Sequence, residues 1–293
     1  MIQYFKSFFL SLMFFLLVPT VVLSGIAIKI PEGMEKPPAM VAVSPARLEL
    51  KIGKKPANSS LKLFNLADEP VTIVATVHNW DLDDNNRVRI VEPTPQSLDQ
   101  WMIINPVKFT IPPHSFQTIR LSIRPNVEPI DGEHRGLIYF TQLLPEPDKV
   151  KGGIHAQFRI GVIVYGLAGN IVRSGKLGSI TFQKERDKGK IMVEVTSTGN
   201  AGIRVKGEYS IWKRASFTGI KKVSKSLFRN HHKPHEPIEA GNLTILPVLP
   251  GTHRTLVTTF KLPQEPGDYV LLVKGSLGKK DFTRQFFFTI TSQ

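Results

Sequence analysis

The chain has 293 residues, of which 41% are hydrophobic and 9% aromatic, and this composition excludes a globally disordered chain. Its formal net charge is +14 at pH 7, with 38 Lys and Arg against 24 Asp and Glu. It contains no cysteine, which excludes disulfides, thiol catalysis and cysteine-based zinc sites. Its 22 Pro and 22 Gly, set among short Val, Ile, Phe and Thr runs, predict an all-β chain with frequent turns.

The N-terminal segment 1–27 is typical of a secretory signal peptide. Lys6 precedes an apolar run over 8–23, and small residues follow from Ser24. The run is shorter than the ~20 residues that a membrane span needs, although an uncleaved anchor is the alternative. We therefore expect an exported protein, soluble or tethered only at its start, in which residues 28–40, rich in Pro, form an extended linker.

Residues 41–168 predict a first β-sandwich domain. Strands are expected at 41–52, 60–66, 71–80, 88–91, 109–111, 118–123, 136–144 and 154–165. About seven strands at a spacing of roughly 8–12 residues, without helical periodicity, are typical of an immunoglobulin-like sandwich.

Residues 169–293 predict a second immunoglobulin-like sandwich. Its strands are expected at 180–183, 190–197, 204–212, 238–249, 255–262, 267–273 and 282–290. The sequence Arg186-Asp-Lys-Gly is expected to form a hairpin turn. Two similar runs, Pro113-His-Ser-Phe-Gln-Thr-Ile and Pro250-Gly-Thr-His-Arg-Thr-Leu, each precede a strand, which fits two related domains in tandem.

Five segments of the first domain carry a resemblance to a known family. They are Val43-Ser-Pro-Ala-Arg-Leu-Glu-Leu, Leu63-Phe-Asn-Leu-Ala-Asp-Glu-Pro-Val, Ile104-Asn-Pro-Val-Lys-Phe-Thr-Ile-Pro-Pro, Gln117-Thr-Ile-Arg-Leu-Ser-Ile-Arg-Pro and Asp131-Gly-Glu-His-Arg-Gly-Leu-Ile-Tyr-Phe. In their order and spacing they resemble the N-terminal domain of periplasmic pilus-assembly chaperones, the PapD-like family of the chaperone–usher systems. The resemblance is weaker over the second domain.

The strand expected at 154–165 is where this resemblance implies a function. Its alternate positions form an apolar row: Ile154, Ala156, Phe158, Ile160 and Val162. The family lends its last strand of domain one to pilus subunits that lack a strand, so this row would fill the groove of a client. Covering the exposed edges of the client prevents aggregation. The alternative is that the row faces the core of its own sandwich.

The family also anchors the C-terminal carboxylate of the client with an Arg and a Lys. Arg47 matches the Arg position, and a guanidinium binds a carboxylate through two hydrogen bonds. The expected Lys position falls at about Gly161 or Val162, so the Lys is missing. Arg159 is the only cation of the strand and is the candidate substitute. The alternative for Arg47 is a solvated cation at a strand edge.

Two polar segments could bind metals. Asp81 to Val88, with Glu92, has the acidic spacing of a calcium loop, but strand-like flanks favour a hairpin tip. His231, His232 and His235 lie in a polar loop, where solvated histidines are favoured over a transition-metal site. We therefore expect no metal and no cofactor.

The basic stretch 213–233 concentrates positive charge in the second domain. In an exported protein it would bind an anionic envelope surface, or it would only add solubility; we expect no nucleic acid.

No catalytic motif is found, so we do not expect an enzyme. The predicted function is that of a periplasmic chaperone that stabilises β-rich pilus or surface-fibre subunits by strand donation, with an outer-membrane usher as a further partner. The alternative is a structural or adhesive envelope protein whose immunoglobulin-like domains bind surface polymers or proteins.

Overall fold

The computed structural model divides the chain into a unit Met1–Pro37 and a unit Pro38–Gln293. Within the second unit it describes residues 41–144, 157–220 and 237–291. The predicted signal peptide and linker, and the histidines at 231, 232 and 235, lie outside the described residues. Within the described ranges, no helix has the length and apolar character needed to cross a membrane.

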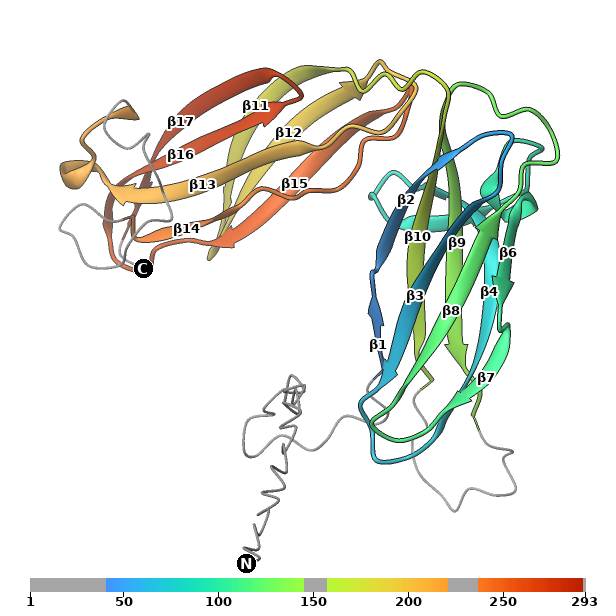
Figure 1. The fold of residues 1–293 in the computed structure, drawn as a ribbon. Helices are drawn as coiled ribbons and strands as arrows, with labels where there is room; N and C mark the ends of the chain where they lie inside the picture. The colour runs from blue at the N-terminus through green and yellow to red at the C-terminus, as the bar shows by residue number, and fades with distance from the viewer. Residues whose placement is uncertain (1–40, 145–156, 221–236, 292–293) are drawn as a thin grey trace, which may run out of the picture. The chain divides into compact units, whose positions relative to one another are not determined.

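The first sandwich consists of strands β1 to β10 and a short 3-10 turn (Figure 1). Its elements are β1 (Val41–Ser44), β2 (Arg47–Ile52), β3 (Ala57–Asn65), β4 (Val71–Leu82), β5 (Val88–Val91), η1 (Leu98–Gln100), β6 (Met102–Asn105), β7 (Lys108–Ile111), β8 (Phe116–Ile123), β9 (Gly132–Gln142) and β10 (Arg159–Ala168). One sheet has the order β1-β3-β8-β6, and the other has the order β2-β10-β9-β4-β5, with β7 paired to β4.

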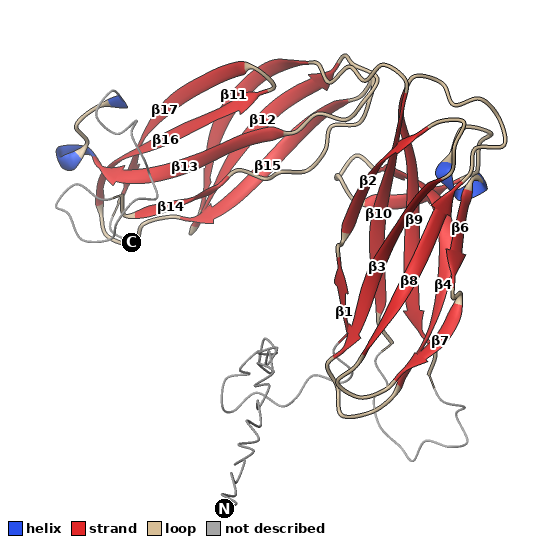
Figure 2. Ribbon diagram, in the orientation of Figure 1, coloured by secondary structure: helices blue, strands red, loops and turns tan. Residues whose placement is uncertain are grey.

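The second sandwich is built from β11 to β17 (Figure 2). Its elements are β11 (Gly175–Glu185), β12 (Lys188–Ser197), β13 (Val205–Lys213), η3 (Arg214–Ser216), β14 (Glu239–Asn242), β15 (His253–Lys261), β16 (Gly267–Leu277) and β17 (Lys280–Ile290). Its sheets have the orders β11-β12-β15 and β14-β13-β16-β17. The prediction of two β-sandwich domains is confirmed.

The two similar sequence runs occupy equivalent places in the two sandwiches. The first leads into β8, which pairs with β3, and the second leads into β15, which pairs with β12. In each run the residue after the proline has a positive φ, 50° at His114 and 70° at Gly251. The two similar runs therefore form corresponding turns, one before β8 and one before β15.

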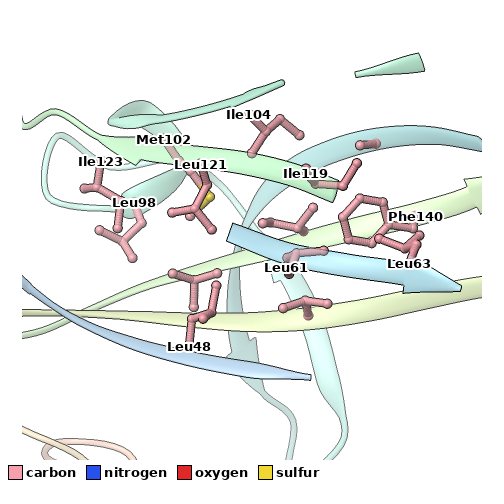
Figure 3. Close-up of a cluster of buried hydrophobic side chains, with 14 of the residues drawn as sticks. Leu48, Leu61, Leu63, Leu98, Met102, Ile104, Ile119, Leu121, Ile123 and Phe140 are labelled. Atoms are coloured by element: carbon pink, nitrogen blue, oxygen red, sulfur yellow. The ribbon is translucent and has the colours of Figure 1, made fainter. Parts of the chain in front are cut away.

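Each sandwich has its own apolar core. In the first, alternate side chains of β3 and β8, such as Leu61, Leu63 and Ile119, are almost completely buried between the sheets (Figure 3). Burying a side chain of this size contributes roughly 1.5–3 kcal/mol, so the two-residue period of the sequence accounts for the packing.

The expected strand at 41–52 is divided at Pro45, which corrects the prediction of one continuous element. β1 pairs with β3 in one sheet, whereas β2 pairs with β10 in the other, and the two strands lie beside different neighbours in Figure 1. Proline has no N–H group to donate to a ladder, so pairing is interrupted at this point. The chain therefore changes sheets between Ser44 and Arg47.

Several expected boundaries differ from the observed ones, and the structure gives a physical reason for two of them. The strand expected at 154–165 stops short of Gly166, but β10 continues to Ala168; a Cβ at Gly166 would lie 2.8 Å from Ile52 Cδ1, so the glycine allows Ile52 of β2 to pack closely against β10. The strand expected at 238–249 is reduced to β14. Its continuation crosses between sheets, because Leu243 N donates to Gly207 O and Thr244 N donates to Thr258 Oγ1.

The acidic segment between β4 and β5 is a hairpin tip, as the sequence favoured. The Asp83 carboxylate accepts the backbone N–H groups of Asn85 at 2.9 Å and Arg87 at 2.8 Å, and Asn86 has a φ of 61°. This is an Asx-type turn, in which the aspartate stabilises the backbone. The second predicted turn is also confirmed, since Glu185 pairs with Lys188 across Arg186, whose φ is 43°.

Tyr209 provides a pH-dependent test of the second core. Burial, together with the charge of Glu239 and a 3.1 Å hydrogen bond to its Oε1, raises the pKa of Tyr209 to about 12. The folded state therefore favours the neutral phenol, and this stabilisation is lost as pH rises from 10 through 12. We expect Tyr209→Phe to cost about 1 kcal/mol at pH 8. In urea unfolding, the difference in the free energy of unfolding between wild type and variant should shrink above pH 10. A difference that stays constant up to pH 12 would contradict the role of the Tyr209 phenol.

Candidate functional site

One edge of β10 is paired along only part of its length. β9 pairs with β10 from Arg159 to Ala168, but on the other side β2 pairs only with Ile163–Ala168. Among the described residues, no strand pairs with that second edge from Arg159 to Val162. The division at Pro45 is the cause, because the residues that could have continued along this edge belong to β1 in the other sheet. An unpaired edge presents N–H and C=O groups to a further strand.

The structure places three residues of the predicted apolar row. Phe158 is half-buried and packs against the first core, Ile160 is half-buried, and Val162 is completely buried. Val162 contributes to the core of its own sandwich. Arg159 and Gly161 are exposed on the opposite face, as their alternation predicts. Ile154 and Ala156 lie outside the described residues.

Arg47 lies where the open edge ends. It is the first residue of β2 and stands opposite Ile163, and β2 runs parallel to β10. A strand added to the open edge in the direction of β2 would therefore reach the start of β2 at Arg47, and its C-terminal carboxylate would lie there only where it is the last strand of its chain. A strand added in the opposite direction would place its N-terminal end beside Arg47, where it would offer no terminal carboxylate.

The Arg47 side chain is 52% exposed and has one acidic neighbour on its own strand. Its Nε lies 3.7 Å from Oε1 of Glu49, which is two residues further along β2 and on the same face. The other oxygen of Glu49, Oε2, lies 3.4 Å from Nη2 of Arg173, in the segment between β10 and β11. The two arginines therefore share one carboxylate.

Arg159 is held apart from Arg47. Arg159 precedes Ile163, the residue opposite Arg47, by four positions, and an extended strand covers about 13 Å over four steps. Its Nε donates to Thr141 Oγ1 at 3.2 Å, and its guanidinium lies 5.2 Å from the centre of the Tyr139 ring. The structure does not bring these two cations together as one carboxylate clamp.

A side chain at Gly161, the expected Lys position, would meet side chains of β9, although the glycine itself is exposed. A Cβ there would lie 3.2 Å from Leu137 Cδ1 and 3.3 Å from Tyr139 Cε1, which is tighter than ordinary contact. Tyr139 also contacts the His78 ring, at 5.8 Å between ring centres. The space beside Gly161 is therefore partly taken by Tyr139, and a lysine would require this ring to move.

Burial governs the titration of two groups on the same sheet. Burial raises the pKa of the Tyr165 phenol, and the nearby positive charge of Arg204 opposes the shift. Burial also raises the pKa of Glu133, opposed by a hydrogen bond from Gly202 N and by the charge of Arg135.

Sequence reasoning missed Glu49 and Arg173 as neighbours of Arg47. Glu49 carried a usable signal, because residues two apart on a strand share a face. Arg173 carried none, since it follows β10 and reaches Glu49 only through the pairing of β10 with β2.

No family model matches the chain. No curated protein matches it either. Solved structures do, over most of the chain and at low identity, and they are PapD-like chaperones of chaperone–usher pilus systems. The class 5 fimbriae chaperone CfaA is 12% identical, over 87% of this chain and 100% of that chain, with a TM-score of 0.43. The chaperone YadV is 11% identical, over 85% and 99%, with a TM-score of 0.43.

A third match comes from a complex of the Salmonella enterica SafA pilin with the SafB chaperone. It is 12% identical, over 87% of this chain and 99% of that chain, with a TM-score of 0.42. At these identities the similarity concerns the fold.

The open edge predicts a pattern of amide hydrogen exchange along β10. Residues Ile163–Ala168 have a strand on each side, so their amides should be protected. In Arg159–Val162, about half of the amides point away from β9 and should exchange roughly tenfold faster or more. Exchange measured residue by residue by NMR tests this. Uniform protection throughout β10 would show that the edge is covered.

Proposed function

We propose that this protein is an exported chaperone that pairs the open edge of β10 with an incomplete sheet in β-rich pilus or surface-fibre subunits. The observation that supports the proposal most directly is the unpaired edge from Arg159 to Val162, which ends at Arg47. The similarity to pilus chaperones, one of them solved with a pilin, is consistent with this proposal at the level of the fold.

The binding energy would come from two sources. Backbone hydrogen bonds along the open edge would supply affinity that is largely independent of client sequence. The half-buried side chains of Phe158 and Ile160, together with Ile154 and Ala156 upstream, would supply apolar contacts to alternate positions of the groove. Val162 would support the strand from the core of its own domain.

Arg47 would set the register of the client. A guanidinium binds a carboxylate through two parallel hydrogen bonds, and the position of Arg47 at the end of the open edge fits the end of a parallel strand. Arg159, which stacks on Tyr139, would contact the client further along the edge. Export would depend on the predicted signal peptide, and an outer-membrane usher would be the natural acceptor of the client.

Substituting the apolar row should abolish capture. We expect Phe158→Asp with Ile160→Asp to reduce client capture at least tenfold, because a charge facing an apolar groove is costly to desolvate. Capture is measured by co-purification of β-rich subunits with the tagged protein from the periplasm. Val257→Asp, at an exposed position of β15, is the matched control. If the double variant retains its fold by circular dichroism and captures as much client as wild type, strand donation is wrong.

The anchor role of Arg47 predicts a dependence on the client's terminus. With a peptide copied from the C-terminal strand of a captured client, Arg47→Ala should weaken binding roughly tenfold, as expected for a charged hydrogen bond. The amidated peptide should bind wild type and variant equally. Arg120→Ala, on the exposed face of β8, serves as control in calorimetric titrations. Equal losses for both peptides would reject the anchor.

A further inference from the structure

Within the described part of the chain, Glu49 forms the ion pair of the proposed anchor Arg47, and its two oxygens face different arginines. Oε1 lies 3.7 Å from Nε of Arg47, which is longer than a hydrogen bond, and Oε2 lies 3.4 Å from Nη2 of Arg173. Within the described residues, no hydrogen bond from the Arg47 guanidinium is formed. The outer fork of Arg47, which is half-exposed, remains open to a bidentate acceptor.

We propose that Glu49 is a built-in placeholder that holds Arg47 in the absence of client and is displaced toward Arg173 by the client's C-terminal carboxylate. This rests on the proposed function, because it specifies how the anchor of that function is regulated. Glu49 would thereby set the affinity and selectivity of the anchor, and Arg173 would act as its second partner.

The charges at this site match that exchange. Arg47, Arg173 and Glu49 carry a net charge of about +1 at neutral pH, and the charge of Arg173 also acts on Glu133. An incoming carboxylate converts the three groups into two separate ion pairs, one on each arginine. Glu49 needs to give up only the long 3.7 Å approach to Arg47, because its other oxygen already faces Arg173.

The sizes of the effects follow from exposure. The side chains of Arg47, Glu49 and Arg173 are 52%, 36% and 40% exposed, so solvent and salt screen each pair. Exposed pairs contribute ~1 kcal/mol or less, which corresponds to at most about a fivefold change in affinity. The placeholder would therefore tune the anchor without blocking it.

The test uses sodium acetate as a minimal carboxylate and the full-length protein, with the Arg47 Nε–Hε signal followed by NMR at low ionic strength. Glu49→Gln should lower the apparent Kd of acetate at Arg47 about two- to fivefold. Arg173→Gln should raise it by a similar factor, since Glu49 would then be left to Arg47 alone. Glu92→Gln changes the net charge by the same amount as Glu49→Gln, at an exposed position after β5. This control should leave the apparent Kd of acetate within experimental error of wild type.

An unchanged or raised Kd in Glu49→Gln, or an equal decrease in Glu92→Gln, would overturn the placeholder. The acetate measurement needs no client, so its outcome is separate from that of the proposed function. A second arm uses the client peptide with a free or an amidated C-terminus. If the wild-type protein binds the free and the amidated peptide equally well, the anchor role of Arg47 is wrong. If the wild-type protein prefers the free carboxylate and Glu49→Gln increases that preference, both the anchor and the placeholder are supported.

Discussion

The structure of the first sandwich depends on the change of sheets at Pro45. A strand can supply hydrogen-bonding partners to only one neighbour on each side, and the N-terminal strand serves β3 before this point and β10 after it. Proline makes the change possible because it has no N–H group to leave unpaired. As a consequence, part of one edge of β10 is not covered by any described strand, and the candidate site lies along that edge.

The same change of sheets places a cation at the end of the edge. Arg47 is the first residue that pairs with β10, so it necessarily lies where the uncovered stretch stops. Three features therefore lie along this edge of β10: its unpaired backbone N–H and C=O groups, the apolar row, and the positive charge of Arg47 at its end. In the proposed function these three contributions would differ in physical kind, since only the charge would be sensitive to salt and only the apolar contacts would depend strongly on client side chains.

Residue alternation was enough to predict much of this arrangement. It assigned Arg159 and Gly161 to the exposed face and placed Val162 on the opposite face, as found. It could not decide whether Val162 faces a client or its own core, because one-sided alternation is the same in both cases. The sequence also indicated that the lysine expected from the family resemblance is absent. The position of Tyr139 beside Gly161 could not be predicted, because it depends on the register of β9 against β10.

By itself, the sequence determined the properties that are local in the chain: the all-β class, the two-sandwich organisation, the turns at Asp83 and Arg186, and the apolar row that includes Phe158 and Ile160. These follow from the two-residue period of strands and from the turn preferences of particular residues. Only the tertiary structure decided which edge stays open, and that Glu49 stands between Arg47 and Arg173. The reason is that strand pairing joins residues far apart in the chain, and no local pattern specifies the partner.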